Sequence, residues 1–204
     1  MPYEPTVKAP NPTIQAIFDR QSCRCFAPDE VEDETIKVLA ECAQSAPSAC
    51  NMQNINIFVL KGVEKVAEFG LGIEELIVEE LPFMKGIAMS KEKMGLKSFV
   101  FYDAPVAYIM TGNVCDEKAC VYLESDCGHY AQSIMIGAKS LGLDSICVGC
   151  TRGPKTSVAV LEYLKKNFPS FPWEEKGEQR LLLSVGVGKA KVMKAKPSRA
   201  SSKG

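Results

Sequence analysis

The 204-residue chain has little of several features that would identify a function directly. It carries a single histidine, His129, which excludes metal sites built on paired imidazoles. Its 24 Lys and Arg residues balance 25 Asp and Glu residues, and the net charge of −1 gives no reason to expect a nucleic-acid partner. No apolar run approaches the roughly 18–20 residues of a membrane-spanning helix, so we expect no membrane partner. A phosphate-binding P-loop and a Gly-x-Ser-x-Gly nucleophile elbow are also absent from the sequence.

The nine cysteines are odd in number and irregular in spacing. The first residues, Met-Pro-Tyr-Glu, lack the apolar core of a signal peptide, so we expect reduced thiols in a cytoplasmic protein. Cys147 and Cys150 form a Cys-x-x-Cys pair, which could bind zinc or form a redox disulfide. The sequence has no second such pair, so the alternative is that these thiols serve as small apolar residues. We expect His129 in a packed or helix-capping role, with a Cys–His nucleophile pair as the alternative.

The hydrophobic pattern predicts a single α+β domain spanning residues 1–204. Apolar residues recur at helical spacing in residues 13–19, 33–46, 124–141 and 157–167. Short apolar runs typical of strands occur at residues 56–60, 104–110, 145–148 and 181–187. Residues 63–100 are predicted to form helical segments broken by Pro82, Gly86 and Gly95. Because helices outnumber strands without strictly alternating with them, we expect one mixed sheet flanked by helices.

Two guanidinium groups and a hydroxyl group lie close together in one short irregular segment. Arg20, Ser22 and Arg24 alternate in the run Arg-Gln-Ser-Cys-Arg, with Gln21 between the first two. Arginine presents a fork of donors that matches phosphate oxygens, so this segment is a candidate phosphate site. The alternative for the segment by itself is a pair of surface arginines.

A second polar segment follows the helix predicted at residues 33–46. Pro47 disfavours helix in the residue before it, so the helix must end there and a loop begins. The loop carries Ser48, Asn51 and Gln53, and amide side chains can both donate and accept hydrogen bonds at the edge of a heteroaromatic ring. The alternative is a simple helix-terminating turn.

The last part of the sequence is strongly basic. Residues 189–204 contain six basic side chains and no acidic one, and Lys196 and Arg199 are among them. Such a segment is either a solvated, frayed tail or an arm that closes on an anion.

Taken in order, these segments resemble the nitroreductase family of flavin enzymes. The family pattern is Arg-x-Ser-x-Arg-x-Phe, then a helix, then Ala-Pro-Ser-x-x-Asn-x-Gln, and residues 20–26 and 46–53 match both motifs at the expected separation. The helix from Gly128 to Gly142 and the run that follows it to Gly149 resemble the central helix of the family and its next strand. Leu181 to Gly186 resembles its late strand, and the run Lys-Pro-Ser-Arg at 196–199 resembles its basic C-terminal element. Residues 63–100 have no counterpart in these motifs.

The resemblance implies a homodimer with a mainly antiparallel central sheet and two FMN molecules at the subunit interface. The residues implied on the phosphate and ribityl side are Arg20, Gln21, Ser22 and Arg24, with Lys196 and Arg199 closing on the same phosphate. The residues implied along the flavin ring come from the other subunit and are Pro47, Ser48, Ala49 and Asn51, while Gln53 would approach the ribityl chain or the ring. The backbone of Val148 and Gly149 would pass the opposite face of the ring.

The resemblance also implies a reaction in which NAD(P)H gives hydride to the flavin and a flat acceptor, such as a nitroaromatic or a quinone, then receives it. The protein would supply binding, orientation and charge, so no catalytic side chain is assigned. Residues 63–100 would form a lid or insert, and residues 189–204 a basic arm. In the family Gln is usually followed by Pro-Trp, whereas here Asn54 and Ile55 follow Gln53. This departure leaves open a flavin-binding sensor or storage protein without reductase turnover, and a thiol or zinc protein using Cys147 and Cys150 is a further alternative.

Overall fold

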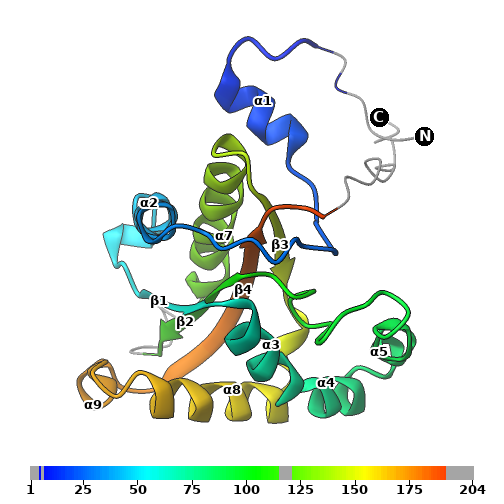
Figure 1. Cartoon of the computed structure of the whole chain (residues 1–204). Helices are drawn as coiled ribbons and strands as arrows, with labels where there is room; N and C mark the ends of the chain where they lie inside the picture. The colour runs from blue at the N-terminus through cyan, green and yellow to red at the C-terminus, as the bar shows by residue number, and fades with distance from the viewer. Residues whose placement is uncertain (1–4, 6, 115–120, 192–204) are drawn as a thin grey trace, which may run out of the picture.

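A four-stranded sheet forms the centre of the protein (Figure 1). The computed structural model describes residue 5 and residues 7–114 and 121–191. The strands are β1 (Ile55–Lys61), β2 (Val106–Asn113), β3 (Asp144–Val148) and β4 (Gln179–Gly188), in the spatial order β1-β2-β4-β3. Each of the three neighbouring pairs is antiparallel, and a single isolated bridge between Ser22 and Ser145 is parallel. The predicted α+β fold with a mainly antiparallel sheet is therefore confirmed.

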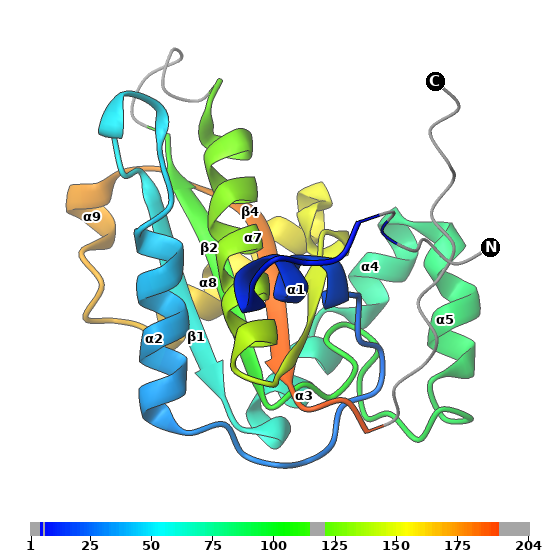
Figure 2. The same ribbon diagram turned by 90° about the horizontal axis from the view of Figure 1, so that it is seen from above.

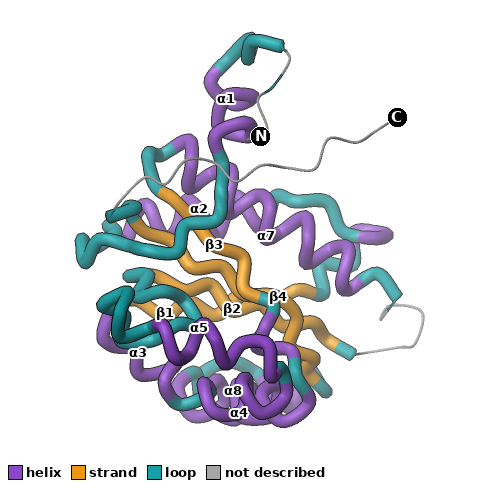
Figure 3. Tube along the Cα trace, turned by 90° about the vertical axis from the view of Figure 1, so that its right-hand side faces the viewer, coloured by secondary structure: helices purple, strands orange, loops and turns teal. Residues whose placement is uncertain are grey.

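Helices cover both faces of this sheet, as the edge view in Figure 3 shows. Helices α2 (Asp33–Gln44) and α7 (Leu123–Ser140) lie side by side on one face (Figure 2). The other face is covered by α3 (Val63–Leu71), α4 (Glu74–Glu80) and α8 (Pro154–Asn167). The remaining helical elements are α1 (Pro12–Asp19), η1 (Ala49–Asn51), η2 (Pro82–Met84), α5 (Lys85–Ser90), η3 (Cys150–Arg152) and α9 (Trp173–Lys176). No helix in the described part of the chain is long and apolar enough to cross a membrane.

Strand β2 shows why the sheet lies between two hydrophobic cores. All eight of its residues are buried, and successive side chains of a strand point to opposite faces. Tyr108 therefore joins the core under α2 and α7, where its hydroxyl donates to the carbonyl of Ile36 at 3.0 Å. Ala107 and Ile109 join the core on the α3, α4 and α8 side. The unbroken apolar run predicted at residues 104–110 is thus explained, because helices cover both faces of the sheet at β2.

A network of amide side chains ties three strands together at the end where β2 finishes. The amide of Asn56 donates to Asn113 Oδ1 at 2.7 Å and to Gln179 Oε1 at 2.9 Å. Gln179 Nε2 donates to Asn113 Oδ1 at 2.8 Å, and the hydroxyl of Thr111 donates to Gln179 Oε1 at 2.8 Å. These polar groups are mostly buried, and their mutual hydrogen bonds offset the cost of removing them from water.

A connecting segment after α1 is attached to the opposite end of the sheet. The amide of Cys23 donates to the carbonyl of Ser145 at 2.9 Å, and the amide of Ala27 donates to Lys189 at 2.8 Å. In return the amide of Lys191 donates to the carbonyl of Cys25 at 2.9 Å. Residues 20–27 therefore cross the start of β3 and the end of β4 in a fixed position.

Most elements lie within a few residues of their predicted positions, and the differences have local causes. Helix α8 begins earlier than predicted, because Pro154 suits the first turn of a helix and Glu80 accepts the amide protons of Lys155 and Thr156 at 2.5 and 3.1 Å. The expected break at Gly86 is wrong, since this residue lies inside α5. The expected packed or capping role of His129 is also wrong, because its side chain is exposed on α7.

The close approach at the end of β4 gives a testable prediction. A Cβ atom at Gly188 would lie 2.4 Å from Cδ of Pro105 and 3.1 Å from Cδ1 of Phe26, and a proline ring cannot rotate away. We expect Gly188→Ala to lower the free energy of unfolding by about 1–3 kcal/mol. Urea denaturation is the measurement.

The matched control is Gly86→Ala, because no atom lies within 4 Å of a Cβ built there and the residue is helical. We expect this control to leave the protein as stable as before, or more stable by up to about 1 kcal/mol. Equal stability of the two variants would contradict the packing assigned to Gly188.

Candidate functional site

Arg20, Ser22 and Arg24 lie on the attached segment that crosses the sheet. Arg20 has an extended backbone, with φ −59° and ψ 126°, directly after α1 ends. In an extended chain, alternate side chains point to the same side. Cys23 is buried whereas Ser22 and Arg24 are exposed, as this alternation requires. Ser22 and Arg24 are therefore accessible to a ligand, and Arg20 is partly exposed.

A cavity of about 210 Å³ opens beside this segment. Arg24 forms one wall, and Val148 and Gly149 at the end of β3 form another. The remaining lining residues are Met84, Ile87, Phe99, Val100, Tyr102, Ile146, Cys147 and Cys150. The site thus joins one guanidinium group to walls that are largely apolar.

The residues of this cavity fit a flat aromatic ligand that carries an anionic group. Apolar side chains suit the faces of a ring, and a guanidinium fork suits phosphate oxygens. The volume of about 210 Å³ is smaller than the roughly 300–1,000 Å³ of most ligand sites. This cavity by itself would therefore enclose only part of such a ligand.

The polar loop after α2 has a strained backbone. Cys50, Asn51 and Gln53 all have left-handed conformations, with φ of 49°, 54° and 50°. Non-glycine residues in this region cost of order 1–3 kcal/mol each and often occur at functional sites. The amide of Gln53 donates to Ser48 Oγ at 3.1 Å, and its side chain donates to Asn51 Oδ1 at 3.0 Å. The amide of Ala49 donates to the carboxylate of Asp126 on α7.

The structure brings together only part of the predicted site. Arg24, Val148 and Gly149 line one cavity, Ser22 pairs with the strand that leads to it, and the charge of Arg20 acts on the neighbouring Cys147 thiol. Gln21 lies in the same segment. The loop residues Pro47, Ser48, Ala49, Asn51 and Gln53 do not line this cavity, and their loop is instead attached to the first turn of α7. Lys196 and Arg199 lie outside the described residues.

The basic arm nevertheless begins beside the arginine segment. The last described residue is Lys191, and its amide is bonded to the carbonyl of Cys25, the residue after Arg24. The described part of the basic arm therefore ends beside the segment that carries Arg20 and Arg24.

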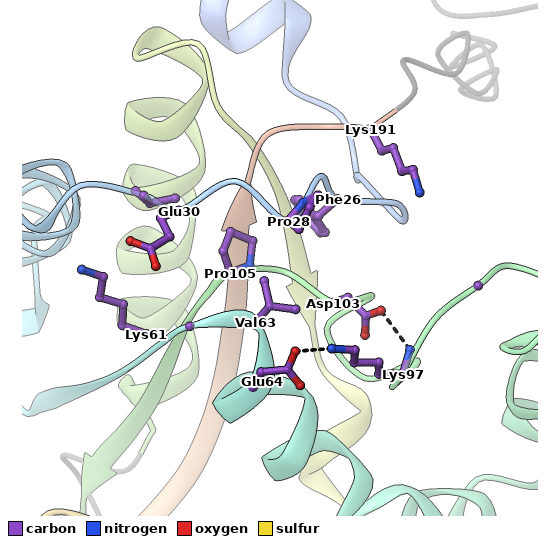
Figure 4. Close-up of a pocket in the computed structure, with 13 residues that line it drawn as sticks. Phe26, Pro28, Glu30, Lys61, Val63, Glu64, Lys97, Asp103, Pro105 and Lys191 are labelled. Atoms are coloured by element: carbon purple, nitrogen blue, oxygen red, sulfur yellow. Dashed lines mark hydrogen bonds and ion pairs between the residues drawn. The ribbon is translucent and has the colours of Figure 1, made fainter.

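A second cavity, of about 460 Å³, lies on the other side of the crossing segment (Figure 4). Two of the three lysines that line it, Lys61 and Lys97, form ion pairs. Lys97 pairs with Glu64, and the carboxylate of Asp103 accepts the amide proton of Lys97 at 2.9 Å. Lys61 pairs with Asp33 at 2.8 Å. Three lysines and three carboxylates line this cavity and leave it without net charge, so we regard it as a crevice between elements and not as the candidate site.

The two thiols of the Cys-x-x-Cys pair both line the cavity of about 210 Å³, but they interact with different neighbours. Cys150 packs against the core on the α8 side, whereas Cys147 interacts with Arg20 and with Cys127 of α7. Although Cys147 keeps an exposed edge, burial of its thiol raises its pKa, and the positive charge of Arg20 opposes that rise. No group of three or more metal-ligating side chains occurs within residues 5, 7–114 and 121–191. Neither observation supports a zinc site at this pair.

Several residues of the site were not found from the sequence. Met84 and Ile87 come from η2 and α5, and Phe99, Val100 and Tyr102 come from the irregular segment before β2. For this region the sequence predicted helical segments broken by Pro82, Gly86 and Gly95, and the resemblance implied a lid, but neither singled out these residues. Asp126 was not singled out either, because it contacts a loop 77 residues away in the sequence.

Comparisons with known proteins identify the family to which the sequence is similar. The sequence model of the Nitroreductase family matches residues 17–189. Nitroreductase NfnB of Mycolicibacterium smegmatis is 26% identical over 176 residues, which cover 71% of this chain and 74% of that protein. The Bacillus subtilis protein named FMN reductase (NAD(P)H) is 25% identical over 169 residues and 78% of this chain. The chain spans 63% of the length of that second relative, which is less than two thirds.

Solved structures show the same fold. A nitroreductase with bound FMN from Desulfitobacterium hafniense DCB-2 has a TM-score of 0.70 and 25% identity, covering 95% of this chain and 96% of that one. A nitroreductase with bound FMN from Bacteroides fragilis has a TM-score of 0.69 at 16% identity, covering 94% and 97%. At this lower identity, the second likeness concerns the fold alone.

The different surroundings of the thiols predict how they react with an alkylating reagent. Burial raises the pKa of Cys150 to about 11 and that of Cys127 to about 12, whereas Cys50 is exposed. The thiolate is the reactive form, so iodoacetamide at pH 7.5 should modify Cys50 well before the other two. Below pH 11 the rate at Cys150 should rise about tenfold per pH unit, because the thiolate fraction rises by that factor. Peptide mapping by mass spectrometry measures the rate at each cysteine, and far-UV circular dichroism checks that the protein stays folded. Rapid labelling of Cys150 at neutral pH would contradict its burial.

Proposed function

The chain belongs to the nitroreductase family, and on that basis we propose that it is an FMN-dependent oxidoreductase that carries hydride from NAD(P)H to a flat acceptor such as a nitroaromatic or a quinone. The observation that supports the proposal is that Arg24, which shares one short segment with Arg20 and Ser22, lines the cavity at the end of β3. This cavity offers apolar walls for a ring and a cation for its phosphate.

In this proposal the two arginines and the hydroxyl group hold the phosphate. Arg20 and Arg24 come from one extended segment, so their guanidinium groups approach an anion from the same side. The basic arm, including Lys196 and Arg199, closes on the same phosphate. Gln21 contributes from the same segment on the ribityl side. When bound, FMN supplies the hydride chemistry, which is why no acid–base side chain is required.

The ring lies against the end of β3 and under the region of residues 63–100, which acts as a lid. Gly149 has no side chain, and a Cβ there would meet only Leu183, at 3.8 Å, so the backbone can approach a flat ligand. Met84, Ile87 and Phe99 exclude water from this side of the site. Water exclusion strengthens the electrostatic interactions inside and protects a reduced cofactor from side reactions.

A second protomer completes the site in this proposal. The cavity of one chain is small, and the polar loop with Pro47, Ser48, Ala49 and Asn51 lies away from it, beside α7. A two-fold homodimer would bring this loop of one protomer to the ring bound by the other, with Gln53 near the ribityl chain. We also propose a cytoplasmic location, for which the seven free cysteines of the described residues are suited.

The proposed phosphate contacts predict a selective loss of affinity. We expect Arg20→Ala and Arg24→Ala each to weaken FMN binding by about 1–3 kcal/mol, the size of a hydrogen bond between charged groups. Binding of riboflavin, which lacks the phosphate, should change little. Flavin fluorescence titration measures both dissociation constants.

The control for this test is Arg180→Ala, because Arg180 pairs with Glu124 at 2.8 Å and does not line the cavity. This variant should bind FMN as the unmodified protein does. If the protein binds no FMN at all, the proposed function is wrong; if both arginine variants bind FMN normally, the assigned phosphate site is wrong.

Turnover separates the oxidoreductase from a flavin-binding protein without reductase activity, the alternative favoured by Asn54 and Ile55 after Gln53. The protein loaded with FMN should oxidise NADH or NADPH when a quinone or a nitroaromatic compound is added. The decrease in absorbance of the nicotinamide is the measurement. Stable flavin binding with no such decrease, for either nicotinamide and both acceptors, would favour the sensor or storage alternative.

A further inference from the structure

The strained loop that follows α2 requires an external support. Cys50, Asn51 and Gln53 have left-handed backbones although none of them is glycine. Within the loop, the carbonyl of Ser48 accepts the amide proton of Asn51 at 3.0 Å, and Ala49 accepts that of Met52 at 3.0 Å. These are local turn contacts, and they do not set where the loop lies relative to the rest of the protein.

Asp126 supplies the link between this loop and α7. The amide of Ala49 lies 3.1 Å from Oδ1 and 3.2 Å from Oδ2 of Asp126, so both carboxylate oxygens face it. The Asp126 side chain is buried, with the residue only 4% exposed. A buried carboxylate is costly unless hydrogen-bond donors surround it, and its presence here needs an explanation.

The position of Asp126 on α7 explains how the charge is tolerated. It lies in the first turn of the helix, where unpaired backbone amides and the helix dipole stabilise an anion. No side chain caps this helix through its N-cap residue, Tyr122. The carboxylate therefore lies in the favourable field of the α7 N-terminus and accepts the amide proton of Ala49 in the loop.

We infer that Asp126 is a positioning residue that fixes the Pro47–Gln53 loop in the left-handed geometry in which it meets the flavin ring of the partner protomer. The inference rests on the proposed function, because only that function places a ring against this loop. Asp126 does not touch the ligand; it acts through the backbone of Ala49. Its loss would leave the phosphate contacts of Arg20 and Arg24 intact and weaken the ring contacts alone.

The test compares two flavins in Asp126→Ala. We expect the dissociation constants for FMN and for riboflavin to rise by the same factor, between about tenfold and a hundredfold, because one hydrogen bond to a charged group is lost. The ratio of the two constants should stay at its original value. The control is Ser125→Ala in the same helical turn, whose hydroxyl donates to Tyr122 at 2.8 Å and not to the loop.

Strain relief provides a readout that a general loss of stability would not produce. Glycine adopts a positive φ without penalty, so Cys50→Gly favours the left-handed geometry without the carboxylate. The double variant Asp126→Ala with Cys50→Gly should therefore bind riboflavin several-fold more tightly than Asp126→Ala alone. No recovery would show that Asp126 does not act through the conformation of the loop.

Mixed dimers test whether the loop acts on the partner. Protomers with Arg20→Ala and protomers with Asp126→Ala each form homodimers without an intact site. In a heterodimer, the arginine segment of one protomer meets the intact loop of the other, so about a quarter of all sites in a random mixture should regain full FMN affinity. If the loop served its own protomer, no intact site would form, and the inference would be overturned.

The outcomes separate this inference from the proposed function. If the unmodified protein binds neither flavin, the proposed function fails. If it binds both and Asp126→Ala binds them equally well, or loses FMN affinity alone, the inference fails while the function stands. Should Asp126→Ala not fold, Asp126→Asn decides, because it keeps one acceptor but loses the charge-assisted strength of the bond. Asp126→Asn should weaken the binding of FMN and of riboflavin several-fold and by the same factor. Unchanged binding of both would overturn the inference.

Discussion

The backbone hydrogen bonds that attach residues 20–27 to the ends of β3 and β4 are the constraint on which the site depends. They join Cys23 to Ser145, Ala27 to Lys189, and Lys191 back to Cys25. Without them, a segment with no regular secondary structure would have no defined position, and two arginines would repel each other into solvent. With them, the cations lie beside the cavity at the end of β3, and the chain leads into its basic end at the same place.

Periodicity predicted the scaffold well because packing follows the same periodicity. The stripe of Tyr130, Ile134 and Ala138 is the buried face of α7, and the unbroken apolar run around Tyr108 is the doubly covered β2. One arginine of the predicted motif, Arg24, lines a cavity, and the phosphate site itself stays a prediction. These features are local in the sequence, so one chain without relatives is sufficient to find them.

Long-range contacts and unusual backbone conformations could not be predicted from the sequence. Of the three left-handed residues, only Asn51 is of a type enriched in that conformation, and nothing in the sequence predicts it for Cys50 or Gln53. Asp126 is one of many acidic residues until folding brings it to Ala49. The apolar cavity walls at Met84 and Phe99 come from a region whose helices are short, and short helices leave no clear periodic pattern.

The amide network of Asn56, Asn113 and Gln179 has a consequence for how the sheet assembles. A strand paired one residue out of alignment turns every side chain to the wrong face, and here it would also leave several buried amide groups without partners. A misaligned sheet therefore loses hydrogen bonds between buried amide groups in addition to the burial of apolar side chains. The network, at the end of the sheet where β2 finishes, discriminates between alternative strand alignments during folding.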